Sequence, residues 1–198
     1  MSENICKYLI FTFTITYFIK STFKFNLPIL EILLMGIFIA IRFGIPFLFG
    51  NASIIGNLWK VIVFIPIMVL FGGLEEIGWR GYLQLKFEKK FGFFVATLIN
   101  CAIWIVWHIP LCFIKGTYQY SGNYLWFVVS SMGSAFLLTA INKVRGSVMP
   151  CILFHSVCNA IASYGISINE GVGIAVSTCI QIIFAICVCN RKNDRLLA

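Results

Sequence analysis

Long apolar runs dominate this 198-residue sequence, and they constrain its fold more than any other feature. Hydrophobic residues make up 60% of the chain and charged residues only 11%, against about 45–50% and about 25% in soluble domains. A water-soluble fold of this length could not hide so much apolar surface, so we expect lipid to be its solvent. No repeat or linker divides the chain, which predicts a single membrane-embedded domain over residues 1–198.

The apolar runs predict an all-α fold, a polytopic transmembrane helical bundle of about seven spans, within a range of six to eight. A span needs about 20 residues to cross roughly 30 Å of hydrocarbon, so the first segment is short. The third is too long for one straight crossing, and Gly72-Gly73 is the expected break in it. The segments are residues 8–19, 27–49, 59–85, 91–113, 124–141, 148–164 and 172–189.

Lysine and arginine set the predicted orientation of these spans. They cluster after spans one, three and five and in the C-terminal tail, and they are sparse after spans two, four and six. Because such residues are enriched in cytoplasmic loops, we expect a cytoplasmic C-terminus and an outside N-terminus. The net charge of +8 lies in short clusters and not in a stripe, which argues for contact with anionic lipid and against nucleic acid. The clusters are Lys20/Lys24, Lys86/Lys89/Lys90, Lys143/Arg145 and Arg191/Lys192/Arg195.

Two adjacent glutamates interrupt the third apolar segment, and an arginine follows them. Ionisable groups at membrane depth are costly, so each is a candidate for function. Glu76 and Arg80 are four residues apart, share a helix face and can form an ion pair. Glu75 is rotated from Glu76 by about 100° and is left to point elsewhere. The pair alone could be purely structural, whereas Glu75 has no cation near it in sequence.

Both histidines of the chain also fall within apolar segments. His108 follows Trp104 by four residues, and Asn159 follows His155 by the same interval, so each pair shares a helix face. A carboxylate and an imidazole on either side of one water can act as a general base. An imidazole and an amide N–H aimed at one point can hold the oxyanion of a tetrahedral intermediate. The set therefore favours hydrolysis inside the bundle over the alternative of core histidines with structural hydrogen bonds.

Three motifs occur in order, and together they resemble the CAAX protease and bacteriocin-processing (CPBP, or Abi) family of intramembrane proteases. The marks of that family are E-E-x-x-x-R, then an aromatic residue, commonly F, followed four residues later by H, and then H-x-x-x-N/D. The resemblance covers roughly residues 70–162, and Trp104 stands where phenylalanine is common. The matching motifs are Glu75-Glu76-Ile77-Gly78-Trp79-Arg80, Trp104-x-x-x-His108 and His155-x-x-x-Asn159.

The resemblance implies four catalytic residues in an intramembrane endopeptidase. Glu75 would activate the attacking water with help from His108, and His155 with Asn159 would bind the oxyanion. The pair Glu76–Arg80 would support the site structurally. The expected partners are the lipid bilayer and a peptide or protein substrate, which includes membrane-associated ones, and the expected location is a bacterial plasma membrane.

Zinc dependence and two other functions stay open at this point. Glu75, His108 and His155 could bind zinc, but H-E-x-x-H is absent, and we expect an enzyme without a metal or other cofactor. The family also implies an alternative, a non-proteolytic membrane regulator or bacteriocin self-immunity protein. A transporter would use intramembrane glutamate and histidine too, but it predicts paired broken helices in two related halves, and only one Gly-Gly break is found.

Overall fold

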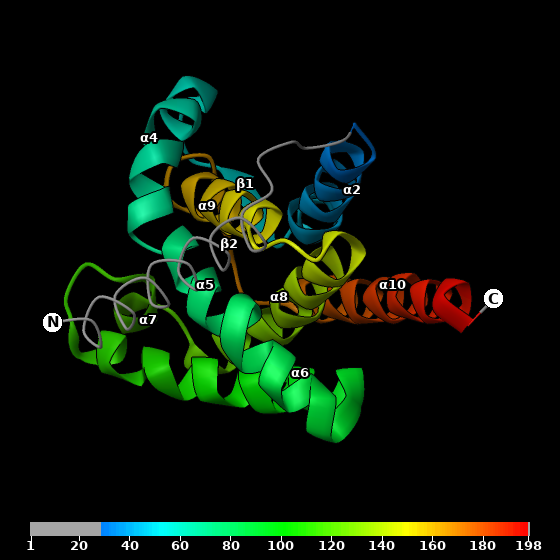
Figure 1. The fold of residues 1–198 in the computed structure, drawn as a ribbon. Coiled ribbons are helices and arrows are strands. Elements are labelled where there is room, and N and C mark those ends of the chain that lie inside the picture. Colours follow the sequence, from blue (N-terminus) through cyan, green and yellow to red (C-terminus); the bar gives the residue numbers. More distant parts are fainter. Residues whose placement is uncertain (1–28, 198) are drawn as a thin grey trace, which may run out of the picture.

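Helices make up most of the structure, as the apolar runs predict (Figure 1). The computed structural model describes residues 29–197, so the first predicted segment, residues 8–19, lies outside the described residues. In chain order the elements are α2 (Ile29–Ile39), the π-helical η1 (Ala40–Gly44), α3 (Ile45–Leu48), β1 (Ala52–Ile54), α4 (Leu58–Leu70), η2 (Gly73–Glu75), α5 (Glu76–Gly78), the π-helical η3 (Trp79–Leu83), α6 (Gln84–His108), η4 (Ile109–Phe113), α7 (Tyr118–Ser121), α8 (Tyr124–Arg145), α9 (Met149–Tyr164), β2 (Ile166–Ile168) and α10 (Val172–Leu197).

Four helical stretches of the described chain are long and apolar enough to cross a membrane, so the count of seven spans is not confirmed. The predicted spans 59–85 and 91–113 fall within one such stretch of 55 residues. The predicted span 148–164 corresponds to α9, which has 16 residues. At 1.5 Å per residue it is only about 24 Å long, less than the hydrocarbon thickness. The four stretches are Glu31–Leu48, Trp59–Phe113, Tyr124–Val144 and Val172–Asn190.

The break expected at Gly72-Gly73 is confirmed. Helix α4 ends at Leu70, Gly72 has a φ of 156°, and the chain resumes as η2. A residue with a side chain rarely adopts that backbone conformation, so glycine is suited to this position. The break redirects the chain immediately before the two glutamates.

A second break lies at Gly92, inside the helix α6. Gly92 has φ 73° and ψ 169°, values outside the helical region, and only glycine adopts them readily. The predicted loop at residues 86–90 is helical instead, and the chain turns at Gly92. The helical residues 79–91 before the turn, which belong to η3 and the start of α6, form a first arm, and the rest of α6 forms a second. The second arm bonds back to the first: Asn100 Nδ2 donates to the Trp79 carbonyl at 3.0 Å.

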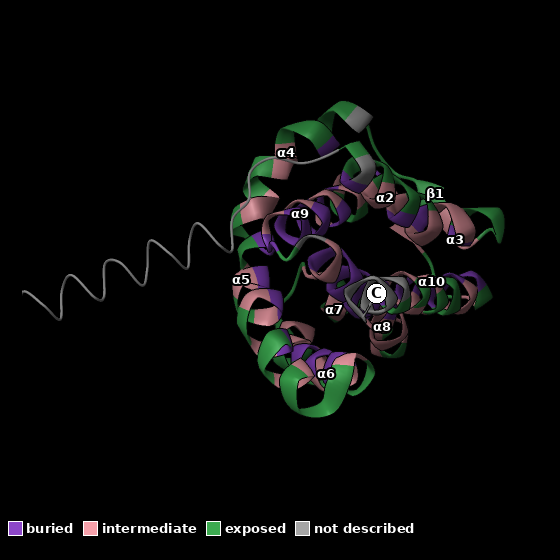
Figure 2. Cartoon of the chain, turned by 45° about the vertical axis from the view of Figure 1, so that its right-hand side comes forward, coloured by how far each residue is buried: buried purple, intermediate pink, exposed green. Residues whose placement is uncertain are grey.

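The core of the bundle is apolar and aromatic, and much of its outer surface is apolar as well. Helix α10 packs along α8, and α9 packs along α4. The Phe38 and Phe154 rings meet edge to face at 6.2 Å. Figure 2 shows buried residues facing the interior and exposed residues covering the outside. The exposed set includes large apolar side chains such as Leu48 (84%) and Phe113 (79%), which identifies lipid as the surrounding solvent.

Successive connections between the predicted spans lie at alternate ends of the bundle, as the basic clusters predict. At one end β1 pairs with β2 in antiparallel register, and the side chains of Asn51 and Asn123 both reach Glu170. At the other end, where α8 finishes, Lys143 Nζ lies 2.5 Å from Glu88 Oε1. The segments after predicted spans two, four and six therefore share one end, and the segments carrying Lys86–Lys90 and Lys143 share the other.

Candidate active site

Helix α9 passes so close to the Gly72-Gly73 break that side chains on these glycines would not fit. A Cβ on Gly73 would collide with Ser156 Oγ and come within 3.0 Å of the Ile152 carbonyl oxygen. A Cβ on Gly72 would lie 2.6 Å from Asn159 Nδ2 and 3.5 Å from His155 Nε2. The two glycines thus let the chain that carries the glutamates rest directly on the face of α9 that carries His155 and Asn159.

Glu76 is the centre of a buried ionic network. Its side chain is fully buried, it forms the predicted ion pair with Arg80 at 3.0 Å, and Arg80 is only 2% exposed. His155 Nδ1 lies 2.7 Å from Glu76 Oε1. Because a carboxylate accepts hydrogen bonds, this nitrogen carries the proton. The other ring nitrogen, Nε2, faces Gly72 and is left for a ligand. When the ring carries a proton on both nitrogens, Nε2 donates as well.

Glu75 has different surroundings from its neighbour. It is half-buried, and its Oε2 accepts hydrogen bonds from the indole nitrogens of Trp79 at 3.3 Å and Trp104 at 3.5 Å. No cationic side chain in the described part of the chain pairs with it. The carboxylate therefore has two neutral donors on one oxygen, and its second oxygen is available to a water or a substrate.

His108 ends the second arm of α6 beside Trp104. Its Nδ1 lies 2.8 Å from the Trp104 carbonyl oxygen, so Nδ1 carries the proton and Nε2 is free for a ligand. The Trp104 ring is 4.6 Å from the His108 ring and 6.0 Å from the His155 ring. Both imidazoles are thus close to the indole that also donates to Glu75. Within residues 29–197, no direct hydrogen bond joins His108 to Glu75.

Asn159 lies one helical turn after His155 on α9. It is half-buried, its Nδ2 faces Gly72, and its amide makes no hydrogen bond to other described residues. The four residues proposed from sequence as catalytic are therefore arranged around Trp104 and Gly72. Among the described residues none of the four is hydrogen-bonded to another: the Glu75 carboxylate is bonded to Trp79 and Trp104, and the His155 ring to Glu76.

The sequence reasoning missed a buried polar ladder between the arms on either side of Gly92. Besides its hydrogen bond to Trp79, Asn100 donates a second one to Gln84 Oε1 at 3.2 Å. Gln84 in turn donates to Thr97 Oγ1 at 3.1 Å. All three polar side chains are at most 2% exposed. The sequence signal that could have indicated the ladder is the presence of these polar side chains at membrane depth, because such groups need hydrogen-bond partners inside the protein.

The residues of the zinc alternative do not fit a metal site as they are arranged. Among the described residues, no three His, Cys, Asp or Glu side chains are grouped closely enough to hold a metal ion. We therefore derive no step through a metal.

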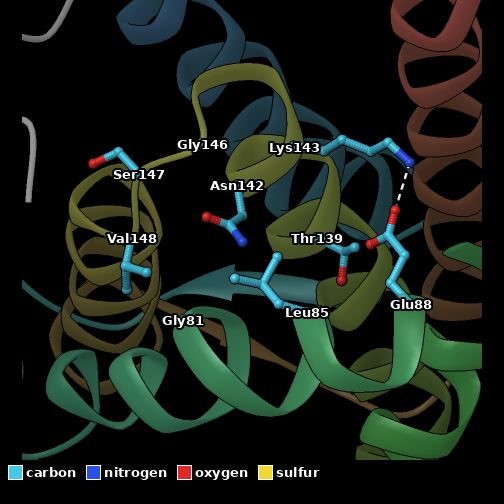
Figure 3. A pocket seen from close by; sticks show the side chains of 9 residues that line it. All are labelled: Gly81, Leu85, Glu88, Thr139, Asn142, Lys143, Gly146, Ser147 and Val148. Atoms are coloured by element: carbon cyan, nitrogen blue, oxygen red, sulfur yellow. Dashed lines mark hydrogen bonds and ion pairs between the residues drawn. The ribbon is translucent and has the colours of Figure 1, made fainter. Parts of the chain in front are cut away.

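A cavity of about 400 Å³ lies at the end of the bundle that carries Glu88 and Lys143 (Figure 3). None of the four candidate catalytic residues lines it. The Asn142 side chain points toward the helix carrying Gly81 and Leu85, and its Nδ2 donates to the Arg80 carbonyl at 3.0 Å. The cavity wall is thus connected to the Glu76–Arg80 pair. Its lining residues are Gly81, Leu85, Glu88, Thr139, Asn142, Lys143, Gly146, Ser147 and Val148.

Comparisons with known proteins match the region that contains this site. The family described as Type II CAAX prenyl endopeptidase Rce1-like matches residues 57–161, more than half of the chain. CAAX prenyl protease 2 of Methanococcus maripaludis is 28% identical over 138 residues, 65% of this chain. The chain spans about half the length of that curated relative (50%). No solved structure matches the present chain. The resemblance seen in the three motifs is confirmed, and the chain belongs to the Rce1-like family of type II CAAX prenyl endopeptidases.

Proposed function

We propose that this chain is an intramembrane endopeptidase in which Glu75 is the general base. One observation carries the proposal: of two adjacent glutamates, one is paired with a cation and the other is not. Glu76 is fully buried and neutralised by Arg80, whereas Glu75 is half-buried and has no cationic partner among the described residues. A carboxylate kept without a counter-ion at membrane depth costs stability, so we assign it a chemical role.

The proposed reaction is a water-mediated cleavage of a peptide bond. Glu75 takes a proton from water while His108 orients that water, and the hydroxide oxygen adds to the scissile carbonyl carbon. The electron pair of the C=O bond becomes an oxyanion, which Asn159 Nδ2–H and His155 Nε2–H stabilise. When the oxyanion collapses, the C–N bond breaks and the proton passes to the leaving nitrogen. The products are a new carboxyl group and a new amine.

The proposed substrate is a peptide or protein that reaches the site from the membrane or its surface. The name of the Methanococcus maripaludis relative denotes a CAAX prenyl protease, which makes a prenylated CAAX peptide the first probe to try. The enzyme would reside in the plasma membrane of a bacterium, with the Glu88–Lys143 end of the bundle in the cytoplasm because the basic clusters lie there.

A substrate trap tests this proposal in cells. A Glu75→Gln variant should bind its substrate and leave it uncut, because an amide does not accept the proton at neutral pH. Affinity purification from membranes should recover an intact protein or peptide with this variant and a shortened one with the wild type. If Glu75→Gln preserves the cellular phenotype of the wild type, the alternative of a non-proteolytic regulator or self-immunity protein replaces the proposal.

A further inference from the structure

Two tryptophan indoles from different arms of the chain bind one oxygen of Glu75. Trp79 Nε1 and Trp104 Nε1 lie 3.3 and 3.5 Å from Glu75 Oε2, and no other side-chain hydrogen bond reaches this carboxylate among the described residues. We infer that Trp79 and Trp104 are positioning residues that hold Oε2 and leave Oε1 to face the attacking water. This inference rests on the proposed role of Glu75 as the base.

Both indoles are themselves held in place. Trp104 is 7% exposed, and its ring packs edge to face against the rings of His108 and His155. The carbonyl of Trp79 accepts the hydrogen bond from the buried Asn100. Because Asn100 comes from the opposite arm, the turn at Gly92 brings both donors to the same carboxylate. Trp79 thus donates from the first arm and Trp104 from the second.

The chemistry of indole suits a general base. An indole N–H is a donor only and has no lone pair to take the proton that the carboxylate receives. A lysine or arginine in its place would neutralise the carboxylate and compete for it as an ion pair. Two neutral donors can orient Glu75 and stabilise its charge in apolar surroundings without that competition. A phenylalanine at either position would keep the ring and remove the donor.

The indole resonances of the five tryptophans provide a test that needs no substrate. In detergent-purified protein with ¹⁵N-labelled indoles, each Trp→Phe variant assigns one N–H cross-peak. Replacing Glu75 by Ala should move the Trp79 and Trp104 peaks upfield, because both lose a charged acceptor. The matched variant Glu88→Ala, at the far end of the bundle, should move neither peak. Unmoved Trp79 and Trp104 peaks in Glu75→Ala would overturn the inference.

The kinetic consequence is a loss in kcat with an unchanged KM. Trp104→Phe should lower kcat about tenfold, since one hydrogen bond to a charged group is worth about 1.5–3 kcal/mol and the bond here is long. The probe is an internally quenched farnesylated peptide with a CAAX end. The control Trp59→Phe removes an indole that is 58% exposed on α4 and should leave kcat unchanged. An equal loss in both variants would contradict the positioning role. Shifted indole peaks in a protein without peptidase activity would support the two hydrogen bonds to Glu75 but overturn the proposed function and, with it, the positioning of a base.

Discussion

Glu75 and Glu76 are neighbours in sequence, yet the fold gives them opposite environments. Arg80 and His155 contact the carboxylate of Glu76 from two elements. Among residues 29–197, the side-chain donors to Glu75 are the neutral N–H groups of two indoles. The rotation of about 100° between successive helical residues accounts for this difference. We therefore expect substitution of Glu76 to affect mainly stability and substitution of Glu75 to affect mainly catalysis.

Removing the charge of Glu76 should destabilise the protein far more than removing that of Glu75. Glu76→Gln leaves Arg80 as a buried cation without its partner, a change that costs about 3–5 kcal/mol. Glu75→Gln breaks no ion pair among the described residues and removes an uncompensated charge, so it should not lower the unfolding temperature in detergent. The measurement is thermal unfolding of both purified variants beside the wild type. Equal unfolding temperatures for the two variants would contradict the assignment.

Asn159 should matter for rate and little for stability. Its amide has no hydrogen bond to other described residues, so Asn159→Ala leaves no buried group unsatisfied. Loss of one oxyanion donor typically lowers kcat on the order of 10²–10³. Steady-state cleavage of the quenched peptide gives kcat, and thermal unfolding verifies that the variant is folded. An unchanged kcat would remove Asn159 from the oxyanion site.

At the scale of elements, two glycines break helices for different physical reasons. Gly72 combines a φ of 156° with close contact to Asn159 and His155, whereas Gly92 has a φ of 73° and open space where a Cβ would lie. Gly72→Ala should therefore disturb the site directly and abolish most activity. Gly92→Ala should cost about 1–3 kcal/mol of backbone strain, because φ 73° with ψ 169° is a conformation essentially restricted to glycine, and it should keep the site intact. Comparing kcat and unfolding temperature of the two variants tests this, and similar activities would contradict it.

Local spacing predicted part of this arrangement, and long-range packing decided the rest. The i, i+4 interval predicted the Glu76–Arg80 pair, and Gly72-Gly73 predicted the break. The contact between His155 and Glu76 joins residues 79 positions apart, and no local pattern indicates it. The predicted segment 148–164 is the helix α9 (Met149–Tyr164), and the break predicted at residues 86–90 lies at Gly92. The number of spans could not be predicted reliably, because an apolar composition marks buried residues and lipid-facing residues alike.

At the scale of the whole molecule, the two ends of the bundle differ in charge and in the segments they gather. Single cysteines at Lys89 and Lys143, in a background without the native cysteines, should react with a membrane-impermeant reagent from the same face. Cysteines at Asn51 and Glu170 should react from the other face, because their segments meet at the opposite end. Lys89 and Lys143 positions accessible from opposite faces would refute this topology.

The measurement that tests the central claim most directly is peptide cleavage by wild type and Glu75→Gln, purified in detergent, with the metal content of each sample determined. We predict that a metal-free wild-type sample cleaves the peptide and that Glu75→Gln, folded and membrane-extracted in equal amount, loses activity on the order of 10²–10⁴. Cleavage by Glu75→Gln at the wild-type rate would contradict the role of Glu75 as the base. Activity that disappears with a chelator and returns with zinc would contradict the metal-free mechanism.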